Sequence, residues 1–438
     1  MSGEVLAALM FPCLFFFVLL GLPISFSLLV ASAIFAWPLF GDAVANQLYG
    51  GITQTATSFV LSAVPPFIFM GFMLERSGVA ERLFNALQLW LGRMPGGLAL
   101  ATMGMASILA ASTGIVGAVE VLIGVMAIPA MMARKYDKAL ISGVICAGGS
   151  LGTMIPPSIV VVIYATVAQL SVGQLFLAVM LPAAIMVFLF VGYILALALR
   201  YPAAAPREER EDDVALGTKL WVTLTALVPM MGLIVAVLGS ISFGIASPTE
   251  AAAVGALGTI LLTIAYGRFR WATFWDALRQ TLLVNSMILL IVVGGTLFSG
   301  TFRIHGGNEL VRDLFEATGF GDTGVILMML LVVFIAGFIL DWVSVILICL
   351  PIFVPVFAGM DVEPLWFAVL MIVVIQTSYL TPPMAPSIFY LRSIAPPDIT
   401  YRDMYRGVVP FICAQILTLL LVFFFPALAT WLPSLVAL

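Results

Sequence analysis

Long apolar stretches alternate with short polar ones along the whole chain. Each apolar stretch of about 18 or more residues is long enough to cross a bilayer as a helix. Two of them carry a Pro-Pro pair at their centre, GGSLGTMIPPSIVVVIY at Gly148–Tyr164 and QTSYLTPPMAPSIFYL at Gln376–Leu391. Because proline removes a backbone donor and clashes with the preceding turn, both are predicted to be broken helices. Two such helices in corresponding halves of a chain indicate the substrate and ion sites of a secondary transporter.

Composition narrows the class of protein. The 438 residues are 63% hydrophobic and only 9% charged, which predicts an all-α polytopic membrane protein. Such a protein is embedded in the lipid bilayer, and we expect no nucleic-acid binding. A membrane enzyme would need a nucleophile with a base, or a metal cluster. The chain has one histidine and four dispersed cysteines, so we expect neither an enzyme nor an organic cofactor.

Internal similarity divides the chain into two halves. SGVAERLFNAL at Ser77–Leu87 resembles GGNELVRDLFEAT at Gly306–Thr318. Each segment follows one span and precedes an apolar block with a polar centre, a Pro-Pro segment and a last span. We therefore predict inverted repeats at residues 1–200 and 243–438. Residues 201–242 form a flexible cytoplasmic linker and one connecting span, and this odd number of spans inverts the second repeat.

The apolar block before each Pro-Pro segment is about 36 residues long, at 96–132 and at 322–357. That length suits either two spans or one re-entrant helical hairpin. As a hairpin, each block would stop its polar centre at mid-membrane, beside the broken helices at about 139–168 and 364–393. As two spans, it would bring the polar centre out on the far side. The predicted architecture has the re-entrant hairpins.

The basic residues favour one orientation in the membrane. With four crossings in each repeat, sixteen of the eighteen Lys and Arg residues fall on the side of the N-terminus, and only Arg303 and Arg312 fall on the other. Cytoplasmic loops carry the excess of positive charge. The count predicts a cytoplasmic N-terminus and a periplasmic C-terminus.

The ordered motifs STGIVGAVEV, RKYDK, GGSLGTMIPPS, SPTEAAA, GFILDW, LPIFVPV and QTSYLTPPMAPSIFYLRSIAPP together resemble the large membrane subunit of tripartite ATP-independent periplasmic (TRAP) transporters. The likeness covers essentially the whole chain. It implies a sodium-driven importer of organic acids in the bacterial inner membrane that works by an elevator-type movement. It also implies two partners, a small four-span membrane subunit, expected here as a separate chain, and a periplasmic substrate-binding protein.

Sodium ions, the coupling ions, need several oxygen ligands, which backbone carbonyls at helix breaks and hydroxyl groups supply without fixed charge. Two sets of residues answer this description, and the resemblance relates them to the paired sodium sites of the family, next to the substrate. The first set is Ser112, Thr113, Gly149, Gly152 and Ser158. The second set is Gly337, Asp341, Ser378, Thr381 and Met384, the last through its carbonyl only. Alternatively, the glycines serve close helix packing and the hydroxyls bond back to their own helices.

Asp341 and three further polar residues invite interpretation. A carboxylate at mid-membrane is functional by default, as we expect of Asp341 unless it lies at a water interface. Glu120 faces either a neighbouring helix or the cytoplasmic cavity. Glu250, behind Pro248, is expected to cap a helix, and His305 to be a solvated loop residue. No Lys or Arg lies within a predicted span, so amide donors and helix N-termini should hold an anionic substrate.

The sequence therefore favours sodium-coupled import of a small carboxylate that a periplasmic protein delivers. One alternative is a sodium-coupled anion symporter of the same superfold that needs no binding protein. A less favoured alternative is a channel.

Overall fold

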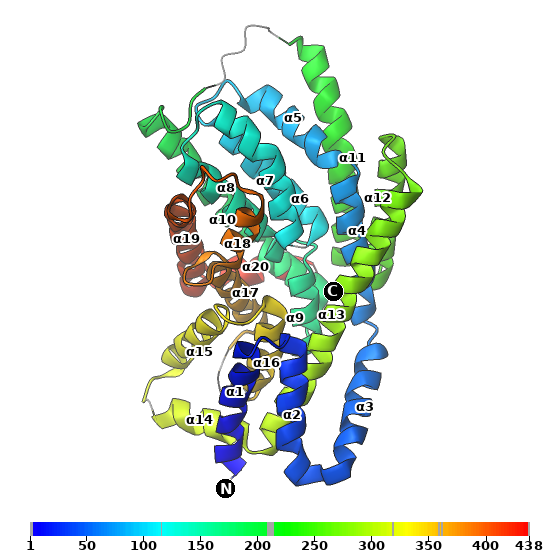
Figure 1. The fold of residues 1–438 in the computed structure, drawn as a ribbon, viewed down its shortest axis with the longest axis vertical. Coiled ribbons are helices and arrows are strands. Elements are labelled where there is room, and N and C mark those ends of the chain that lie inside the picture. The colour runs from blue at the N-terminus through cyan, green and yellow to red at the C-terminus, as the bar shows by residue number, and fades with distance from the viewer. Residues whose placement is uncertain are drawn as a thin grey trace.

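The computed structural model describes residues 3–114, 116–207, 214–317, 319–357, 360 and 362–436. Every regular element within these ranges is a helix (Figure 1). The first half contains α1 (Gly3–Leu19), α2 (Ile24–Phe40), η1 (Gly41–Ala43), α3 (Val44–Ala56), η2 (Leu61–Ala63), α4 (Val64–Arg76), α5 (Val79–Leu91), α6 (Gly97–Thr113), α7 (Val116–Ala133), α8 (Lys138–Ser150), η3 (Leu151–Thr153), α9 (Ile159–Ala168) and α10 (Val172–Arg200). The second half contains α11 (Leu216–Ser242), α12 (Pro248–Ala265), α13 (Trp271–Ile304), α14 (Gly307–Ala317), α15 (Asp322–Ala336), α16 (Trp342–Phe357), α17 (Pro364–Leu380), α18 (Pro386–Ile394), α19 (Tyr401–Phe424) and α20 (Ala427–Ser434).

Many of these helices are suited to a bilayer. Within the described residues, six helical stretches are long and apolar enough to cross a membrane: the joined α2 and α3, then α10, α11, α12, α13 and α19. The hairpin helices, α1, α9 and α17 are also apolar, but shorter. The chain is a multi-pass membrane protein, as its composition predicts.

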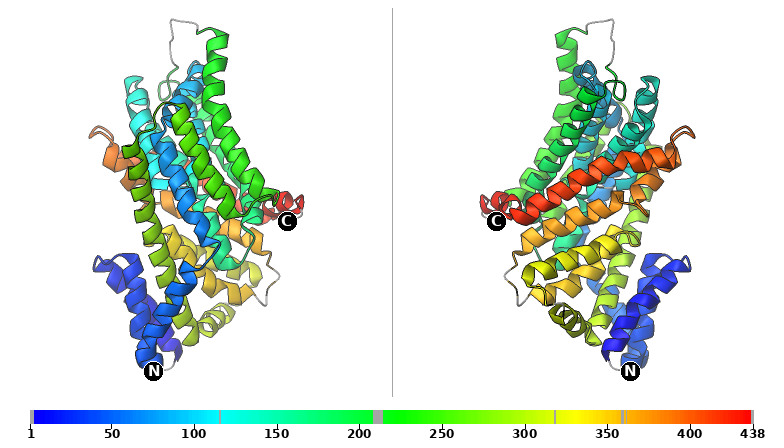
Figure 2. Two further views of the ribbon diagram at one scale, coloured as in Figure 1. Left: turned by 90° about the vertical axis from the view of Figure 1, so that its right-hand side faces the viewer. Right: turned by 90° about the vertical axis from the view of Figure 1, so that its left-hand side faces the viewer.

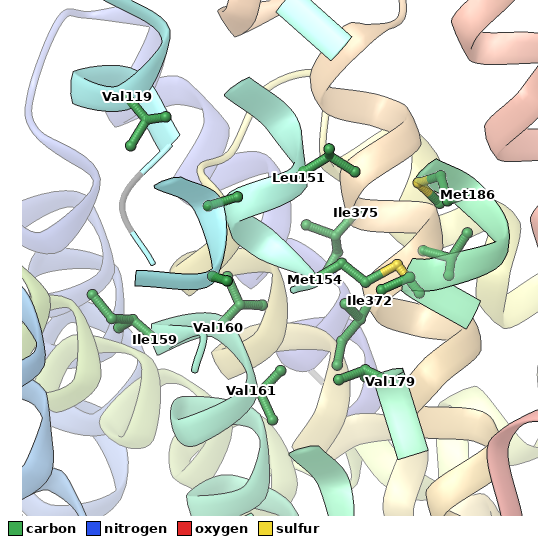
Figure 3. Packing of buried hydrophobic residues seen from close by; sticks show 14 of the residues in the cluster. Val119, Leu151, Met154, Ile159, Val160, Val161, Val179, Met186, Ile372 and Ile375 are labelled. Carbon is green, nitrogen blue, oxygen red and sulfur yellow. The ribbon is translucent and has the colours of Figure 1, made fainter. Parts of the chain in front are cut away.

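Both Pro-Pro segments interrupt their helices. In the first, α8 ends at Ser150 and α9 begins only at Ile159. In the second, α17 ends at Leu380 and α18 begins at Pro386. The two broken helices pack against each other, and Figure 3 shows Leu151 and Met154 of the first break close to α17. The interruptions therefore meet inside the protein.

Each polar-centred block folds as two helices. In the first block, α6 and α7 pack against each other and meet at Gly114, which has a φ of 58°. A Cβ atom at Gly114 would lie 3.1 Å from the carbonyl oxygen of Pro157 and 3.2 Å from the amide nitrogen of Ile159. The tip of this hairpin therefore lies against the first break. In the second block, α15 and α16 join through residues 337–341.

The N-terminal region corrects the predicted topology. Residues 3–40 form two packed helices, α1 and α2, where the charge count assumes one crossing. A Cβ atom at Gly3 would lie 2.7 Å from the carbonyl oxygen of His305, which directly follows α13 and lies two residues from Arg303. The prediction that the N-terminus shares the side of the sixteen basic residues is therefore wrong. Figures 1 and 2 agree, because they place the N-terminus far from α5 and the start of α11.

Two polar residues near helix ends have opposite outcomes. Glu250 forms a capping box with Ser247 at the start of α12, so its predicted role as a helix cap is confirmed. His305 is only 5% exposed, and its Nε2 atom lies 2.9 Å from the carbonyl oxygen of Phe35. The prediction of a solvated loop histidine is wrong, because α1 and α2 cover this residue.

The start of the linker between the halves is held in place. The amide of Asp137 donates to the carbonyl of Ala204 at 2.9 Å, and the amide of Gly96 donates to the carbonyl of Ala205 at 3.1 Å. The Tyr136 hydroxyl donates to the carbonyl of Pro206 at 2.9 Å. These bonds fasten residues 204–206 to both ends of the first hairpin, so this part of the linker is not flexible. Residues 208–213 lie outside the described ranges.

Glycine allows α8 and α19 to cross in backbone contact. A Cβ atom at Gly407 would lie 2.9 Å from the amide nitrogen of Gly143, and one at Gly143 would lie 2.8 Å from the ring of Phe411. Small residues permit such close approach between membrane helices, where dispersion between backbones stabilises the pair. The first broken helix is thereby anchored to α19.

Gly407→Ala should lower the thermal unfolding midpoint of the purified protein in detergent. The added methyl group forces α8 and α19 apart, and overpacking of this kind costs about 1–3 kcal/mol. Gly192→Ala in α10 is the matched control, because no atom lies within 4 Å of the position that its new methyl group would take. Equal midpoints for the two variants would contradict the proposed backbone contact.

Candidate functional site

A cavity of about 350 Å³ lies where the hairpin tips and the broken helices meet. One side belongs to the hairpins and the broken helices, and the other to α4 and α13. Its lining includes Phe72 of α4, Gly114 and Gly117 of the first hairpin, Ile159 of α9, Val284, Met287 and Ile288 of α13, Gly337, Leu340, Asp341, Trp342, Val343 and Val345 of the second hairpin, Ile375, Ser378 and Tyr379 of α17, and Pro386 and Tyr390 of α18. We call it the tip cavity.

Hydroxyl groups satisfy the backbone freed by the first break. The Ser158 hydroxyl donates to the carbonyl of Thr153 at 2.8 Å, and the Thr153 hydroxyl donates to the carbonyl of Ser150 at 2.9 Å. All three serine and threonine side chains are buried, as is Gly152 between them. Unpaired carbonyls are costly in an apolar interior, so these bonds stabilise the interruption. Ser158 caps no amide of α9, and Ile159, the first residue of that helix, lines the tip cavity.

The structure brings together only part of the first predicted set. Ser112, 1% exposed, lies near the hairpin tip and donates its hydroxyl to the carbonyl of Leu109 at 2.8 Å, within its own helix. The side chain of Thr113 lies outside the described part of the structure. Gly149 is not at the tip: a Cβ atom there would overlap the side chain of Glu120 on α7. This glycine makes room for a buried acid.

Asp341 caps the second hairpin helix. Its backbone carbonyl accepts from the amide of Val345 at 3.0 Å, so it is the residue before the first turn of α16. One carboxylate oxygen accepts from the amide of Val343 at 3.0 Å, and the other accepts from the Ser344 hydroxyl at 2.6 Å. Aspartate is among the preferred residues for this position. The side chain is half-buried and lines the tip cavity, where it is the only charged side chain among the lining residues.

The rest of the second set divides between cavity and surface. Gly337 lies against Ser378, since a Cβ atom at Gly337 would lie 2.8 Å from that of Ser378, and both line the tip cavity. The Ser378 hydroxyl donates to the carbonyl of Ile375 at 2.8 Å. Thr381 donates to the carbonyl of Thr377 at 2.6 Å, and Met384 is 47% exposed. Neither of these two residues lines the cavity.

A buried acid joins the two halves behind the cavity. Glu120 of α7 is 0% exposed, and its Oε1 atom accepts from the hydroxyl of Ser387 in α18. The same hydroxyl lies 3.3 Å from the carbonyl oxygen of Cys146 in α8. The Oε2 atom has no hydrogen-bond partner among the described residues. Of the two sequence-based interpretations of Glu120, the structure supports the one in which it faces neighbouring helices.

Gln376 makes a second connection of this type. Its Nε2 atom lies 3.3 Å from the Ser150 hydroxyl oxygen, which joins α17 to the end of α8. Its Oε1 atom is buried and lacks a hydrogen-bond partner within the described residues. Sequence reasoning did not select Gln376 or Ser387, although both lie in the second Pro-Pro segment. For Gln376 the available signal was a side-chain amide in an otherwise apolar helix.

Two tyrosines of the tip cavity were also missed. Tyr379 and Tyr390 line it from α17 and α18. A Cβ atom at Gly117 would lie 2.6 Å from the Tyr390 ring, so that this ring packs on the first hairpin. The spacing of Gly114 and Gly117 in STGIVGA indicates a surface open to such contact. Phenol groups can donate hydrogen bonds to a ligand in the cavity.

Comparison with known proteins identifies relatives along the whole chain. Residues 11–428 match the profile of a family described as the tripartite ATP-independent periplasmic transporter, DctM component. The C4-dicarboxylate TRAP transporter large permease protein DctM of Pseudomonas aeruginosa is 28% identical over 90% of this chain and 91% of that protein. The ectoine/5-hydroxyectoine permease UehC of Ruegeria pomeroyi is 29% identical over 98% and 99%. The sialic acid permease SiaM of Vibrio cholerae is 27% identical over 95% of both.

Two solved structures share the fold. The YdaH transporter of Alcanivorax borkumensis has a TM-score of 0.61 at 14% identity, and the match covers 89% of this chain and 90% of that one. The efflux pump MtrF of Neisseria gonorrhoeae has a TM-score of 0.60 at 13% identity over 87% and 83%. Identities this low support the architecture and say nothing of the substrate.

The resemblance read from the ordered motifs is thus confirmed over nearly the full length, and it carries with it a role in transport rather than in catalysis. The chain belongs to the large permease (DctM) component family of tripartite ATP-independent periplasmic transporters.

Proposed function

We propose that this permease imports a small organic acid, driven by a sodium gradient, and that the acid binds in the tip cavity. One observation carries the proposal: both hairpins and both broken helices converge on a single cavity that faces α4 and α13. Substrate sites of secondary transporters lie where broken helices of two repeats meet. The named substrates of the relatives, C4-dicarboxylate, ectoine and sialic acid, each carry an acidic group, which supports an organic acid here.

The acid would be held without a basic side chain. No Lys or Arg is among the described residues that line the tip cavity. The first turn of α9, which no side chain caps, begins at Ile159 in its wall, and backbone amides at a helix N-terminus attract negative charge. Tyr379 and Tyr390 add hydroxyl donors. The first turn of α16 is less available, because Asp341 already caps it.

Sodium is proposed as the co-substrate, bound beside the acid. In the second set, Gly337, Asp341 and Ser378 share the cavity wall. In the first set, Ser112 and Ser158 lie on the two segments that meet at Gly114. A serine that donates its hydrogen to a carbonyl keeps oxygen lone pairs for a cation. These hydroxyls can therefore stabilise their helices and also bind sodium.

We further propose an elevator-type movement of two inverted repeats. In each half a helical hairpin, a broken helix and a long helix follow one another, as α6 to α10 and α15 to α19. The tip cavity lies between these units and α4 with α13, the boundary across which one unit would slide. Movement along it would expose the cavity to either side of the membrane.

The basic loops assign the sides of the membrane. The end that carries Arg76, Arg134 and Arg200 is proposed to be cytoplasmic by the excess of positive charge. The start of α1 and His305 then lie on the periplasmic side, with the C-terminus also periplasmic. There the proposed periplasmic binding protein would deliver the substrate, and a small membrane subunit would complete the complex.

Asp341→Asn should abolish or severely impair sodium-driven uptake while leaving stability near parental. Asparagine is as good a cap as aspartate, but it lacks the charge that would balance a sodium ion. Asp341→Ala should lose uptake and also about 1 kcal/mol of stability, because it loses the cap. The assays are thermal unfolding, and uptake of a carboxylate panel by proteoliposomes that contain the complete complex.

Asp322→Asn is the matched control, since Asp322 lies exposed at the other end of the same hairpin and should keep parental uptake. Sodium-independent uptake by the parental complex would refute the coupling. Parental uptake by Asp341→Asn would refute the role of this residue. Uptake without the binding protein would favour the standalone symporter.

Ser112→Ala should raise the sodium concentration that gives half-maximal uptake. Ser142→Ala is the control: Ser142 is also buried and donates to the carbonyl four residues earlier, at 2.8 Å, but lies near the start of α8. If both variants keep the parental sodium response, Ser112 contributes only to its helix. The measurement is the initial rate of uptake against sodium concentration.

Single cysteines at Glu4, Ala203 and Ser434, in a background without the four native cysteines, test the orientation. These positions are exposed. A membrane-impermeant maleimide applied to intact spheroplasts should label positions 4 and 434 but not position 203, which should react only after lysis. Labelling of position 203 in intact cells would invert the proposed topology.

A further inference from the structure

A second cavity, of about 400 Å³, lies between α3, α9, α13 and α16. We call it the Arg303 cavity. Unlike the tip cavity, it is rich in polar side chains. Its lining is Gln54, Thr55, Ser58, Leu61, Thr166, Val167, Gln169, Val292, Thr296, Ser299, Gly300, Arg303, Leu347 and Pro351. It lies toward the end of α13 that contacts the N-terminal helices.

Arg303 gives this cavity its charge. It is the only charged residue among the described residues of the lining, and it has no ion pair or hydrogen bond to any of the described residues. In the sequence-based charge count, Arg303 and Arg312 are the two basic residues set apart from the other sixteen. A cation free of partners in a concave polar site attracts anions and concentrates them.

Among the neighbouring side chains, an amide group rather than a hydroxyl supplies free donors. Thr166 and Thr296 already give their hydroxyl hydrogens to carbonyls of their own helices, at 2.7 and 2.8 Å. The amide group of Gln54 is exposed and unpaired within the described residues. None of the described lining residues carries a carboxylate that would compete for Arg303. Guanidinium and amide donors together suit a carboxylate or sulfonate group.

The two cavities follow one another along α9, α13 and α16. On α13 the tip cavity touches Val284–Ile288, and the Arg303 cavity begins at Val292. On α16 the last residue that lines the tip cavity is Val345, and the first that lines the Arg303 cavity is Leu347. Between them α13 and α16 pack closely, since a Cβ atom at Gly295 would lie 2.6 Å from that of Leu347. The Ser299 hydroxyl also donates to the carbonyl of Leu347, at 2.9 Å.

We propose that the Arg303 cavity is an anion-binding vestibule, which holds the acid group of the substrate before it passes the Gly295–Leu347 contact into the tip cavity. The ligand class is an organic carboxylate or sulfonate. This role rests on the proposed transport of an organic acid, whereas the anion site itself does not. Arg303 thereby supplies the positive charge that the tip cavity lacks.

The anion site is tested with Gln54→Cys in the full-length chain without its four native cysteines, reconstituted in nanodiscs with its small subunit. An anionic sulfonatoethyl methanethiosulfonate and a cationic trimethylammonioethyl methanethiosulfonate modify the thiol. Each reaction rate is first divided by the rate of the same reagent with free cysteine. After this normalisation, the anionic reagent should react about threefold to tenfold faster than the cationic one, as expected for one charge at close range in moderate salt. Arg303→Gln should abolish this preference, and Arg303→Lys should keep most of it.

Arg312→Gln is the control, because it removes the same charge at the same end of the protein from outside the cavity lining. An unchanged preference in Arg303→Gln, or an equal loss in Arg312→Gln, would overturn the anion site. Succinate should slow the modification more than inorganic phosphate at equal charge concentration. Equal protection by phosphate would identify a general anion site and overturn the selectivity for organic acids.

Uptake separates the vestibule from the transport function. In proteoliposomes with the complete complex, Arg303→Gln should raise KM about tenfold with little change in kcat, because it weakens capture and leaves the tip cavity intact. Arg312→Gln should leave KM unchanged. If the parental complex transports no carboxylate, the proposed function fails, and the thiol assay still decides the anion site. Parental KM in Arg303→Gln, with the anion preference abolished, would overturn the vestibule role.

Discussion

The structure depends on one constraint: backbone groups freed inside an apolar surrounding must find partners. Two helices stop at mid-length in this chain, and each interruption exposes carbonyls and amides far from water. Serine and threonine hydroxyls meet this need at the first break, where Ser158 and Thr153 donate to preceding carbonyls. Hairpin tips and glycines then close over the remaining backbone. The cavity at their junction exists because these groups cannot be left in contact with lipid.

Local signals in the sequence predicted the elements that arise from local chemistry. Proline pairs mark both breaks, glycines mark the first hairpin tip, and the Ser-Pro-Thr-Glu run marks the start of α12. Each of these residues changes the backbone only within a few neighbouring positions, so a short motif is enough to identify the effect. The division between α1 and α2 was missed, because the local signal there is weak. Gly21 and Pro23 lie within a nearly continuous apolar run, and the run alone does not separate one crossing from two.

The candidate site was only partly predictable. Gly337, Asp341 and Ser378 share a wall because a hairpin tip and a helix break were both identifiable from sequence. The position of Gly149 was not, since its neighbour Glu120 comes from another helix, and a local pattern contains no information on such a pairing. Asp341 carries a further lesson: a residue predicted to act on ions also caps a helix, so its presence alone does not separate the two roles.

The contacts behind the tip cavity have a consequence for how this protein can change over evolution. Glu120 meets Ser387, and Gln376 meets Ser150, so each polar pair takes one member from each half of the chain. A substitution in one half therefore strands a buried polar group in the other. Recombination that exchanges a single half between distant relatives would inherit mismatched partners. Such chimaeras should be viable only when both members of each pair come from the same parent. The two halves are therefore expected to evolve together.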